Sequence, residues 1–195
     1  MGRSLEQLTA ILMCGGRSSR MGIDKSQLLI GDQTFAQVLC NRLEGFSEVI
    51  ISSNDDALDF LNKKIIKDEK PGCGPLGGIL SSLRACITSY AFVLACDMPR
   101  FSVDIVEHLW QDSSANAEII VPRSSDGRIH PLCAVYKASL ITVIEDQIGR
   151  RDLKMVNLIN RCKTCIVDFP FADSFLNINS PEEYLKYQKS THHSN

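Results

Sequence analysis

Residues 8–25 read LTAILMCGGRSSRMGIDK, and this stretch decides the fold class. It opens with a continuous apolar run, residues 8–13, and then changes abruptly to Gly15-Gly16. A short apolar run that ends at turn residues is typical of a strand buried on both faces of a parallel sheet. The sequence therefore predicts a central strand followed by a glycine-rich loop.

The same pattern recurs along the chain and alternates with helical spacing. Short apolar runs occupy residues 48–53, 91–95 and 119–121, whereas residues 34–43, 76–85 and 103–110 carry apolar side chains three and four positions apart. This alternation is the signature of βαβ units, which connect parallel strands through helices. We expect an α/β fold with a Rossmann-like, doubly wound, mostly parallel sheet and helices on both faces.

The last third of the chain, residues 127–187, has a less regular pattern. Residues 165–169 indicate one more strand. Pro181 is suited to the first position of a final helix, with Ser180 as its N-cap.

Composition limits the class of protein. The chain has 195 residues, of which 44% are hydrophobic and 23% charged, with a net charge of -2, as expected for one globular domain. Without a basic excess it is not expected to bind nucleic acid, so the substrate should be a small molecule. No apolar run approaches the roughly 20 residues that span a bilayer, and the first residues lead into a strand rather than a signal peptide. We expect a cytoplasmic protein with no membrane partner.

Eight cysteines raise the question of disulfides or zinc. A chain of this length can fold without disulfides, and five of its cysteines lie in apolar stretches, so reduced thiols are expected. These five are Cys14, Cys40, Cys86, Cys96 and Cys133. Cys162 and Cys165 form a single CxxC pair without a second pair or a histidine at ligand spacing, which favours ordinary thiols over a zinc site.

The loop after the first strand has the composition of a polyphosphate-binding segment. Glycines allow backbone N–H groups to approach a phosphate, and Arg20 and Lys25 can neutralise its oxygens. The spacing is that of neither a P-loop nor a GxGxxG dinucleotide motif. The alternative is a glycine-rich surface loop with solvated charges.

This loop resembles the nucleotidyltransferase family with the motif L-A-G-G-x-S-x-R-M-G-x-D-K. Its double glycine resembles that of the molybdenum cofactor guanylyltransferases more than the A-A-G form of sugar-nucleotide and cytidylyl enzymes. Met13-Cys14 stands where the family has Leu-Ala, which keeps a small side chain at position 14. The resemblance implies that this segment binds the nucleotide, with Arg20 and Lys25 acting in catalysis. The expected nucleotide contacts here are Met13, Cys14, Gly15, Gly16 and Lys25.

A second segment, residues 67–78, is rich in glycine and proline and leads into a predicted helix, as a ligand-binding loop or a plain connection would. It resembles the family block D-x-x-x-x-x-G-P-L-G-G. The resemblance makes Asp68 a nucleotide contact and lets the run from Gly74 to Gly78 line the base pocket. We also expect Asn54, after the second strand, to contact the nucleotide.

Asp97 is a single carboxylate at the end of an apolar strand, where ligands of doubly wound sheets bind. A carboxylate beside a triphosphate suits Mg²⁺, which combines one or two carboxylates with phosphate oxygens and water. The alternatives are that Asp97 caps the next helix or pairs with Arg100. The family motif C-D-x-P favours the metal, so Asp97 is expected to be a metal ligand, a nucleotide contact and a catalytic residue.

Two later blocks belong to the acceptor side of the family's cleft. Residues 127–136 resemble G-x-x-H-P-L-x-A-x-Y, in which His130 either contacts the acceptor's phosphate or is structural before Pro131. Residues 177–184 resemble N-x-N-T-P-E-E, with Asn179 expected near the metal and acceptor.

These blocks imply a magnesium-dependent enzyme that transfers GMP from GTP to the molybdenum–molybdopterin cofactor. We expect a nucleotide-binding part at about residues 8–100, an acceptor part at about 101–187 and a disordered tail at 188–195. Molybdenum insertion proteins and apo-molybdoenzymes are the partners that the resemblance suggests. The alternatives are a related enzyme that uses CTP on this cofactor or an NTP on a sugar or alcohol phosphate, and a nucleotide-binding protein without catalysis.

Overall fold

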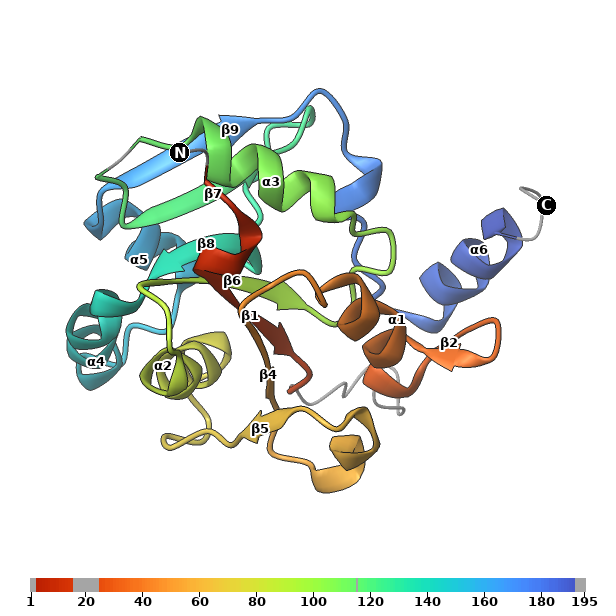
Figure 1. Ribbon diagram of the computed structural model, residues 1–195. Helices are drawn as coiled ribbons and strands as arrows, with labels where there is room; N and C mark the ends of the chain where they lie inside the picture. The colour runs from red at the N-terminus through yellow and green to blue at the C-terminus, as the bar shows by residue number, and fades with distance from the viewer. Residues whose placement is uncertain (1–2, 16–24, 115, 192–195) are drawn as a thin grey trace.

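The computed structural model describes residues 3–15, 25–114 and 116–191. Within these ranges one seven-stranded sheet has the order β5-β4-β1-β6-β8-β7-β9 (Figure 1). β8 is antiparallel to β6 and β7, and the other neighbours are parallel. The predicted α/β fold with a mostly parallel sheet is therefore confirmed. The strands are β1 (Leu8–Met13), β4 (Glu48–Ser52), β5 (Lys64–Ile66), β6 (Tyr90–Ala95), β7 (Ile119–Arg123), β8 (Cys133–Lys137) and β9 (Thr164–Asp168).

Helices surround this sheet, and a small hairpin of β2 (Leu29–Ile30) and β3 (Gln33–Thr34) lies beside it (Figure 1). The α-helices of the described residues are α1 (Phe35–Arg42), α2 (Pro75–Ala85), α3 (Val103–Asp112), α4 (Ile141–Gly149), α5 (Met155–Arg161) and α6 (Pro181–Thr191). Short 3₁₀ segments occupy Leu5–Gln7, Lys25–Gln27, Asp56–Leu61, Ala138–Leu140 and Asp173–Phe175.

The sheet separates two hydrophobic cores, because successive side chains of a strand point to opposite faces. In β1, Ala10 and Leu12 join the core that α1 and α3 cover, whereas Ile11 and Met13 join the core that α2, α4 and α5 cover. All six residues of β1 are buried. The continuous apolar run thus predicted the central strand correctly, and helices cover both faces as expected.

The C-terminal helix departs from the sequence prediction. α6 begins at Pro181 as expected, and the Ser180 hydroxyl accepts a hydrogen bond from the N–H of Glu183 at 3.2 Å. It continues to Thr191, so the predicted disordered tail does not start at residue 188. The reason is tertiary: Tyr187 is buried, and the Arg100 guanidinium donates a 2.8 Å hydrogen bond to the hydroxyl of Ser190.

Two further features bear on the composition arguments. All eight cysteines are free thiols, and those at positions 14, 40, 96 and 133 are buried. Every helix within the described ranges is too short or too polar to cross a membrane.

Candidate active site

The carboxyl ends of three neighbouring parallel strands meet at one edge of the sheet. Met13, the last residue of β1, pairs in register with Ser52 of β4 and Ala95 of β6. The ladder continues one step further, because the N–H of Cys14 donates to the Ser52 carbonyl at 2.9 Å and that of Cys96 donates to the Met13 carbonyl at 3.0 Å. The segments that begin at Cys14 and Cys96 therefore leave the sheet side by side.

Lys25 and Asp97, which the sequence places in one site, are in direct contact. Lys25 Nζ lies 2.7 Å from Asp97 Oδ2 and 2.6 Å from Asn179 Oδ1. The side chains of Lys25 and Asp97 are 17% and 18% exposed, so water screens this ion pair only in part. The N–H of Ile178 donates to the Asp97 carbonyl at 2.9 Å, which holds Asn179 in place.

The two structural alternatives for Asp97 do not match this geometry. The N-cap of α3 is Ser102, whose hydroxyl accepts from the N–H of Asp104. The guanidinium of Arg100 is paired with Asp173 at 3.7 Å. The Asp97 carboxylate instead points to the edge where Lys25 and Asn179 meet.

Asn54 and Asp68 form a second polar pair, at the ends of β4 and β5. The Asp68 N–H donates to Asn54 Oδ1 at 2.8 Å, and Asn54 Nδ2 donates to Asp68 Oδ2 at 3.3 Å. Burial raises the pKa of the Asp68 carboxyl above its usual range, and the hydrogen bond from Asn54 opposes that shift. A partly desolvated carboxylate with spare acceptor capacity suits a donor group of a ligand.

The start of α2 packs closely against this pair. Gly74, the N-cap, has a φ of 58° and is followed by Pro75. A Cβ at Gly78 would lie 2.6 Å from Oγ of Ser52 and 2.7 Å from Cε of Met13. It would also lie 3.2 Å from Oδ1 of Asp68. Only glycine fits there without displacing these side chains.

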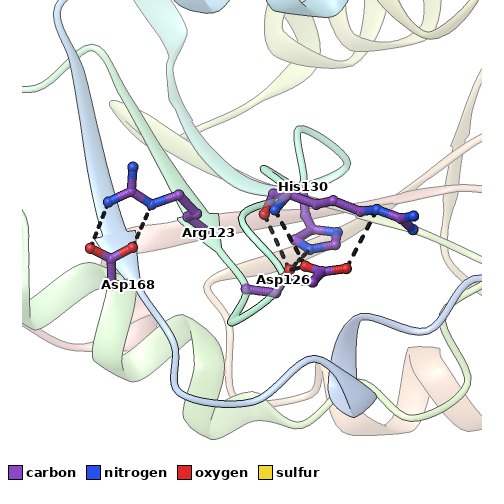
Figure 2. A network of polar contacts seen from close by, with 6 residues as sticks. Arg123, Asp126, His130 and Asp168 are labelled. Atoms are coloured by element: carbon purple, nitrogen blue, oxygen red, sulfur yellow. Dashed lines mark hydrogen bonds and ion pairs between the residues drawn. The ribbon is translucent and has the colours of Figure 1, made fainter.

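His130 lies on the other side of Asp97, in the loop between β7 and β8. Its Nε2 is 2.7 Å from the hydroxyl of Ser124, which donates to Asp126 Oδ1 at 2.5 Å (Figure 2). The imidazole stacks on Phe175 with ring centroids 4.4 Å apart and an interplanar angle of 14°. Burial lowers the pKa of His130, although the nearby Asp126 acts in the opposite direction.

A separate ion pair lies at the end of this edge that is formed by β7 and β9. Arg123 and Asp168, at the ends of β7 and β9, form two hydrogen bonds of 2.6 and 2.8 Å (Figure 2). The pair is exposed, and the contact with Arg123 lowers the pKa of the Asp168 carboxyl.

The sequence-derived site was therefore incomplete in identifiable ways. The predicted contacts Gly16 and Arg20 lie outside the described residues, whereas Met13, Cys14 and Gly15 lie at the end of β1 as expected. Ser124, Asp126 and Phe175 were not predicted. The sequence does show a Ser-x-Asp pattern at residues 124–126, shortly before His130. The same pattern is typical of an ordinary turn, so it did not mark a functional site.

The donor set fits a divalent metal ion that shares its ligands with a nucleotide. Asp97 and Asn179 offer two oxygens that already face one cation, the Lys25 ammonium, and oxygen ligands are those that Mg²⁺ prefers. The described residues contain no group of three or more His, Cys, Asp or Glu side chains that could hold a metal without other ligands. A metal bound here would need ligands from substrate or water.

Both the sequence and the fold are similar to those of known proteins. The family model described as the MobA-like NTP transferase domain matches residues 10–163. A probable molybdenum cofactor guanylyltransferase of Clostridium perfringens is 33% identical over 187 residues, covering 90% of this chain and 93% of that protein. The molybdenum cofactor guanylyltransferase of Campylobacter jejuni subsp. doylei is 31% identical, covering 94% and 97%. The crystal structure of molybdopterin-guanine dinucleotide biosynthesis protein A from Archaeoglobus fulgidus has the same fold, with a TM-score of 0.82 at 20% identity over 95% of this chain and 100% of that one.

Proposed function

The chain belongs to the MobA-like NTP transferase domain family, and from this we propose that it transfers GMP from GTP to the molybdenum–molybdopterin cofactor. The observation that carries the proposal is the bridge from Lys25 to Asp97 and Asn179 at the carboxyl edge of the sheet. The relatives named molybdenum cofactor guanylyltransferase supply the choice of nucleotide and acceptor. The product is the molybdopterin guanine dinucleotide cofactor, and pyrophosphate is released.

The reaction needs positioning and charge neutralisation rather than a protein nucleophile. The terminal phosphate of molybdopterin attacks the α-phosphorus of GTP, and the bond to the pyrophosphate breaks. Lys25 stabilises negative charge on the leaving phosphates, and Arg20 has the same role. Gly15 and Gly16 are the proposed backbone contacts of the phosphates.

The nucleotide's base and sugar occupy the edge formed by β1, β4 and β5. Asp68, held by Asn54, accepts hydrogen bonds from the base or sugar, and Gly78 keeps this surface open. Met13 and Cys14 contact the nucleotide from the end of β1. This gives a nucleotide-binding part at about residues 8–100 and an acceptor part at about 101–187.

Asp97 and Asn179 would hold magnesium at the boundary between these two parts. Bound there, the ion would neutralise triphosphate charge and polarise the α-phosphate. Before nucleotide binds, the Lys25 ammonium satisfies the same two oxygens, so they do not repel each other. We also propose that the protein acts in the cytoplasm and that molybdenum insertion proteins or apo-molybdoenzymes receive the product.

Two measurements test the proposal. Thermal shifts with GTP, CTP, UTP and ATP, each with Mg²⁺, rank the nucleotides, since a ligand stabilises the fold by RT ln(1 + [L]/Kd). GTP is expected to give the largest shift, and pyrophosphate release should require the molybdenum cofactor. A larger shift with CTP, or turnover with a sugar phosphate instead, would assign a different transferase activity. Nucleotide binding without pyrophosphate release would make the chain a non-catalytic binding protein.

A further inference from the structure

Ser124 fixes the proton of His130 on one ring nitrogen. The single hydroxyl proton of Ser124 is donated to Asp126 Oδ1, the shorter of its two acceptor contacts at 2.5 Å. The oxygen of Ser124 must then accept from His130 Nε2, 2.7 Å away. A neutral imidazole that donates through Nε2 carries an unshared electron pair on Nδ1.

That electron pair has no partner within the described part of the chain. Nδ1 of His130 makes no hydrogen bond there, and it is not one of the three buried side-chain atoms that lack one, Oε2 of Glu48, Oγ of Ser82 and Oε1 of Gln147. Solvent or a ligand can therefore reach it. The stacking on Phe175 fixes the plane of the ring and hence the direction in which Nδ1 points.

His130 also lies close to Asp97, on the side away from the proposed nucleotide contacts. The Leu132 carbonyl, two residues after it, accepts from the N–H of Ala95 at 2.8 Å, which places the loop at the carboxyl end of β6. Phe175, against which the ring packs, is three residues before Ile178, whose N–H is bonded to the Asp97 carbonyl. The imidazole thus flanks Asp97 on the side away from Asn54 and Asp68.

The charges around His130 cancel in pairs. Asp126 faces Arg128 at 3.4 Å, and Arg123 is bound to Asp168 by two hydrogen bonds (Figure 2). As far as the structure describes the chain, these pairs leave this end of the edge without excess positive charge. A phosphate monoester, with a second pKa of about 6, is mostly a dianion at pH 7 and has no hydrogen to donate to a nitrogen lone pair.

We propose that Nδ1 of His130 accepts a hydrogen bond from a ring N–H or amino group of the acceptor, so that this part of the edge binds the acceptor's planar heterocycle and not its phosphate. The inference rests on the proposed function, whose acceptor carries a pterin ring, and it assigns that ring to the His130 end of the edge. Asp126 and Ser124 are positioning residues that act through His130. The acceptor then lies with its ring near His130 and its phosphate near Asp97. This replaces the sequence-based expectation that His130 contacts the phosphate.

The test compares two probes on one variant. A phosphate-free 2-amino-4-oxopteridine represents the ring, and glycerol phosphate represents the phosphate; both are titrated in the presence of GTP and Mg²⁺. His130→Gln can still donate to Ser124 but loses the acceptor at Nδ1. We expect it to bind the pterin at least tenfold more weakly and glycerol phosphate within twofold of the wild-type affinity. Weaker phosphate binding with unchanged pterin binding, or no change in either, overturns the proposal.

Two controls separate this result from misfolding. Phe175 also contacts Phe169, with ring centroids 5.4 Å apart, and His108 packs edge-on against Phe169 at 5.1 Å. His108→Gln therefore alters another histidine of the same aromatic cluster and should leave pterin binding unchanged. The thermal shift with GTP should be the same in both variants, because neither residue lies on the nucleotide side. An equal loss of pterin affinity in His108→Gln would mean that the effect is structural.

An independent spectroscopic readout needs no substrate. In ¹⁵N-labelled protein at neutral pH, Nδ1 of His130 should show the chemical shift of an unprotonated ring nitrogen and Nε2 that of a protonated one. The opposite tautomer would contradict the proposal. Wild-type protein that binds the pterin but releases no pyrophosphate from GTP would refute the proposed function and leave the ring subsite standing.

Discussion

At the scale of single residues, the ammonium of Lys25 joins segments that lie 72 and 154 positions away along the chain. An ammonium and a divalent ion are attracted to the same oxygens of Asp97 and Asn179. In the proposed mechanism, a bound metal–nucleotide complex would release Lys25 from Asp97 toward the phosphates. The contact with Asp97 and the proposed contact with the phosphates would then exclude each other.

Asp97→Asn tests the charge in this contact while keeping an oxygen that Lys25 can reach. Removing one preorganised electrostatic group typically costs about 10²–10³ in rate, or about 2.7–4 kcal/mol. We expect a fall of this size in pyrophosphate release at saturating Mg²⁺. Asp112→Asn is the control, since that carboxylate is 56% exposed and pairs with His108 at 3.5 Å. Turnover close to wild type in Asp97→Asn would remove Asp97 from the metal site.

Asp68→Asn should raise the stability of the fold and weaken the binding of GTP. Burial raises the pKa of Asp68, so the folded state disfavours its charged form, and at pH 7.5 the neutral amide should raise Tm. Because the pKa of Asp68 is raised in the folded state, its carboxylate becomes protonated as the pH falls through that pKa. The wild-type protein then regains the stability that the buried charge costs at pH 7.5. The Tm advantage of the variant should accordingly shrink between pH 7.5 and pH 4. GTP affinity should fall about tenfold, or about 1.4 kcal/mol. A lower Tm at pH 7.5 would contradict the assignment.

At the scale of elements, the close fit of α2 against β1 and β4 depends on Gly78. Gly78→Ala should cost about 1–3 kcal/mol of unfolding free energy, because the new methyl group displaces Ser52 and Met13. GTP binding should weaken with it. In Gly149→Ala, at the end of α4, no neighbouring atom lies within 4 Å of the added Cβ, so the change should be neutral or stabilising by about 0.5–1 kcal/mol. Urea unfolding of both variants gives the comparison.

Helix α6 fixes the segment that carries Asn179 by packing on the β2–β3 hairpin. The Tyr184 hydroxyl accepts from the N–H of Leu29 at 3.1 Å and donates to its carbonyl at 2.9 Å. Tyr184→Phe removes both bonds and should cost about 0.5–1.5 kcal/mol for each. Its turnover should fall as well, since Lys25 and Asn179 lie next to the two elements that Tyr184 joins. Leu185→Ala, 55% exposed on the same helix, is the control, and equal losses in both variants would exclude a specific role for Tyr184.

Elements with strong local patterns were predictable from the sequence, and those defined by distant contacts were not. The apolar run of β1 and the helical spacing of α2 and α3 mark them directly. β5 has three residues and is only partly buried, so its sequence carries little signal. β8 is antiparallel and pairs with β6 across about 40 residues of chain, which no local pattern reveals.

At the scale of the whole molecule, the candidate site follows from sheet topology. Parallel strands place their carboxyl ends at one edge, which was sufficient to predict that Lys25 and Asp97 lie together. The stacking of His130 on Phe175 depends on how segments 45 residues apart in the chain meet, which no local pattern reveals. The hydrogen bonds of Ser124 lie within one loop, and its Ser-x-Asp pattern is also typical of an ordinary turn. Topology predicted where the site lies, and only the side-chain geometry distinguishes its two ends.

The alkylation rate of Cys133 provides a measure of the global stability of the fold. It lies fully buried in β8 between β6 and β7, and burial strongly raises the pKa of its thiol. Only a deprotonated and exposed thiol is alkylated, so Cys133 should react at neutral pH only through global unfolding. Cys73, half-buried in the turn before α2, should react without it.

Ligand binding should therefore slow alkylation of Cys133 by a calculable factor. GTP with Mg²⁺ at 100 times its Kd stabilises the folded state by about 2.7 kcal/mol and lowers the unfolded fraction about 100-fold. When unfolding and refolding are fast relative to alkylation, the rate at Cys133 should fall by the same factor, as measured by mass spectrometry after timed exposure to iodoacetamide. CTP at equal concentration should protect less, in the ratio of its Kd to that of GTP. If Cys133 is alkylated at the same rate with GTP, with CTP and without nucleotide, the site around Asp68 and Lys25 is not coupled to GTP binding.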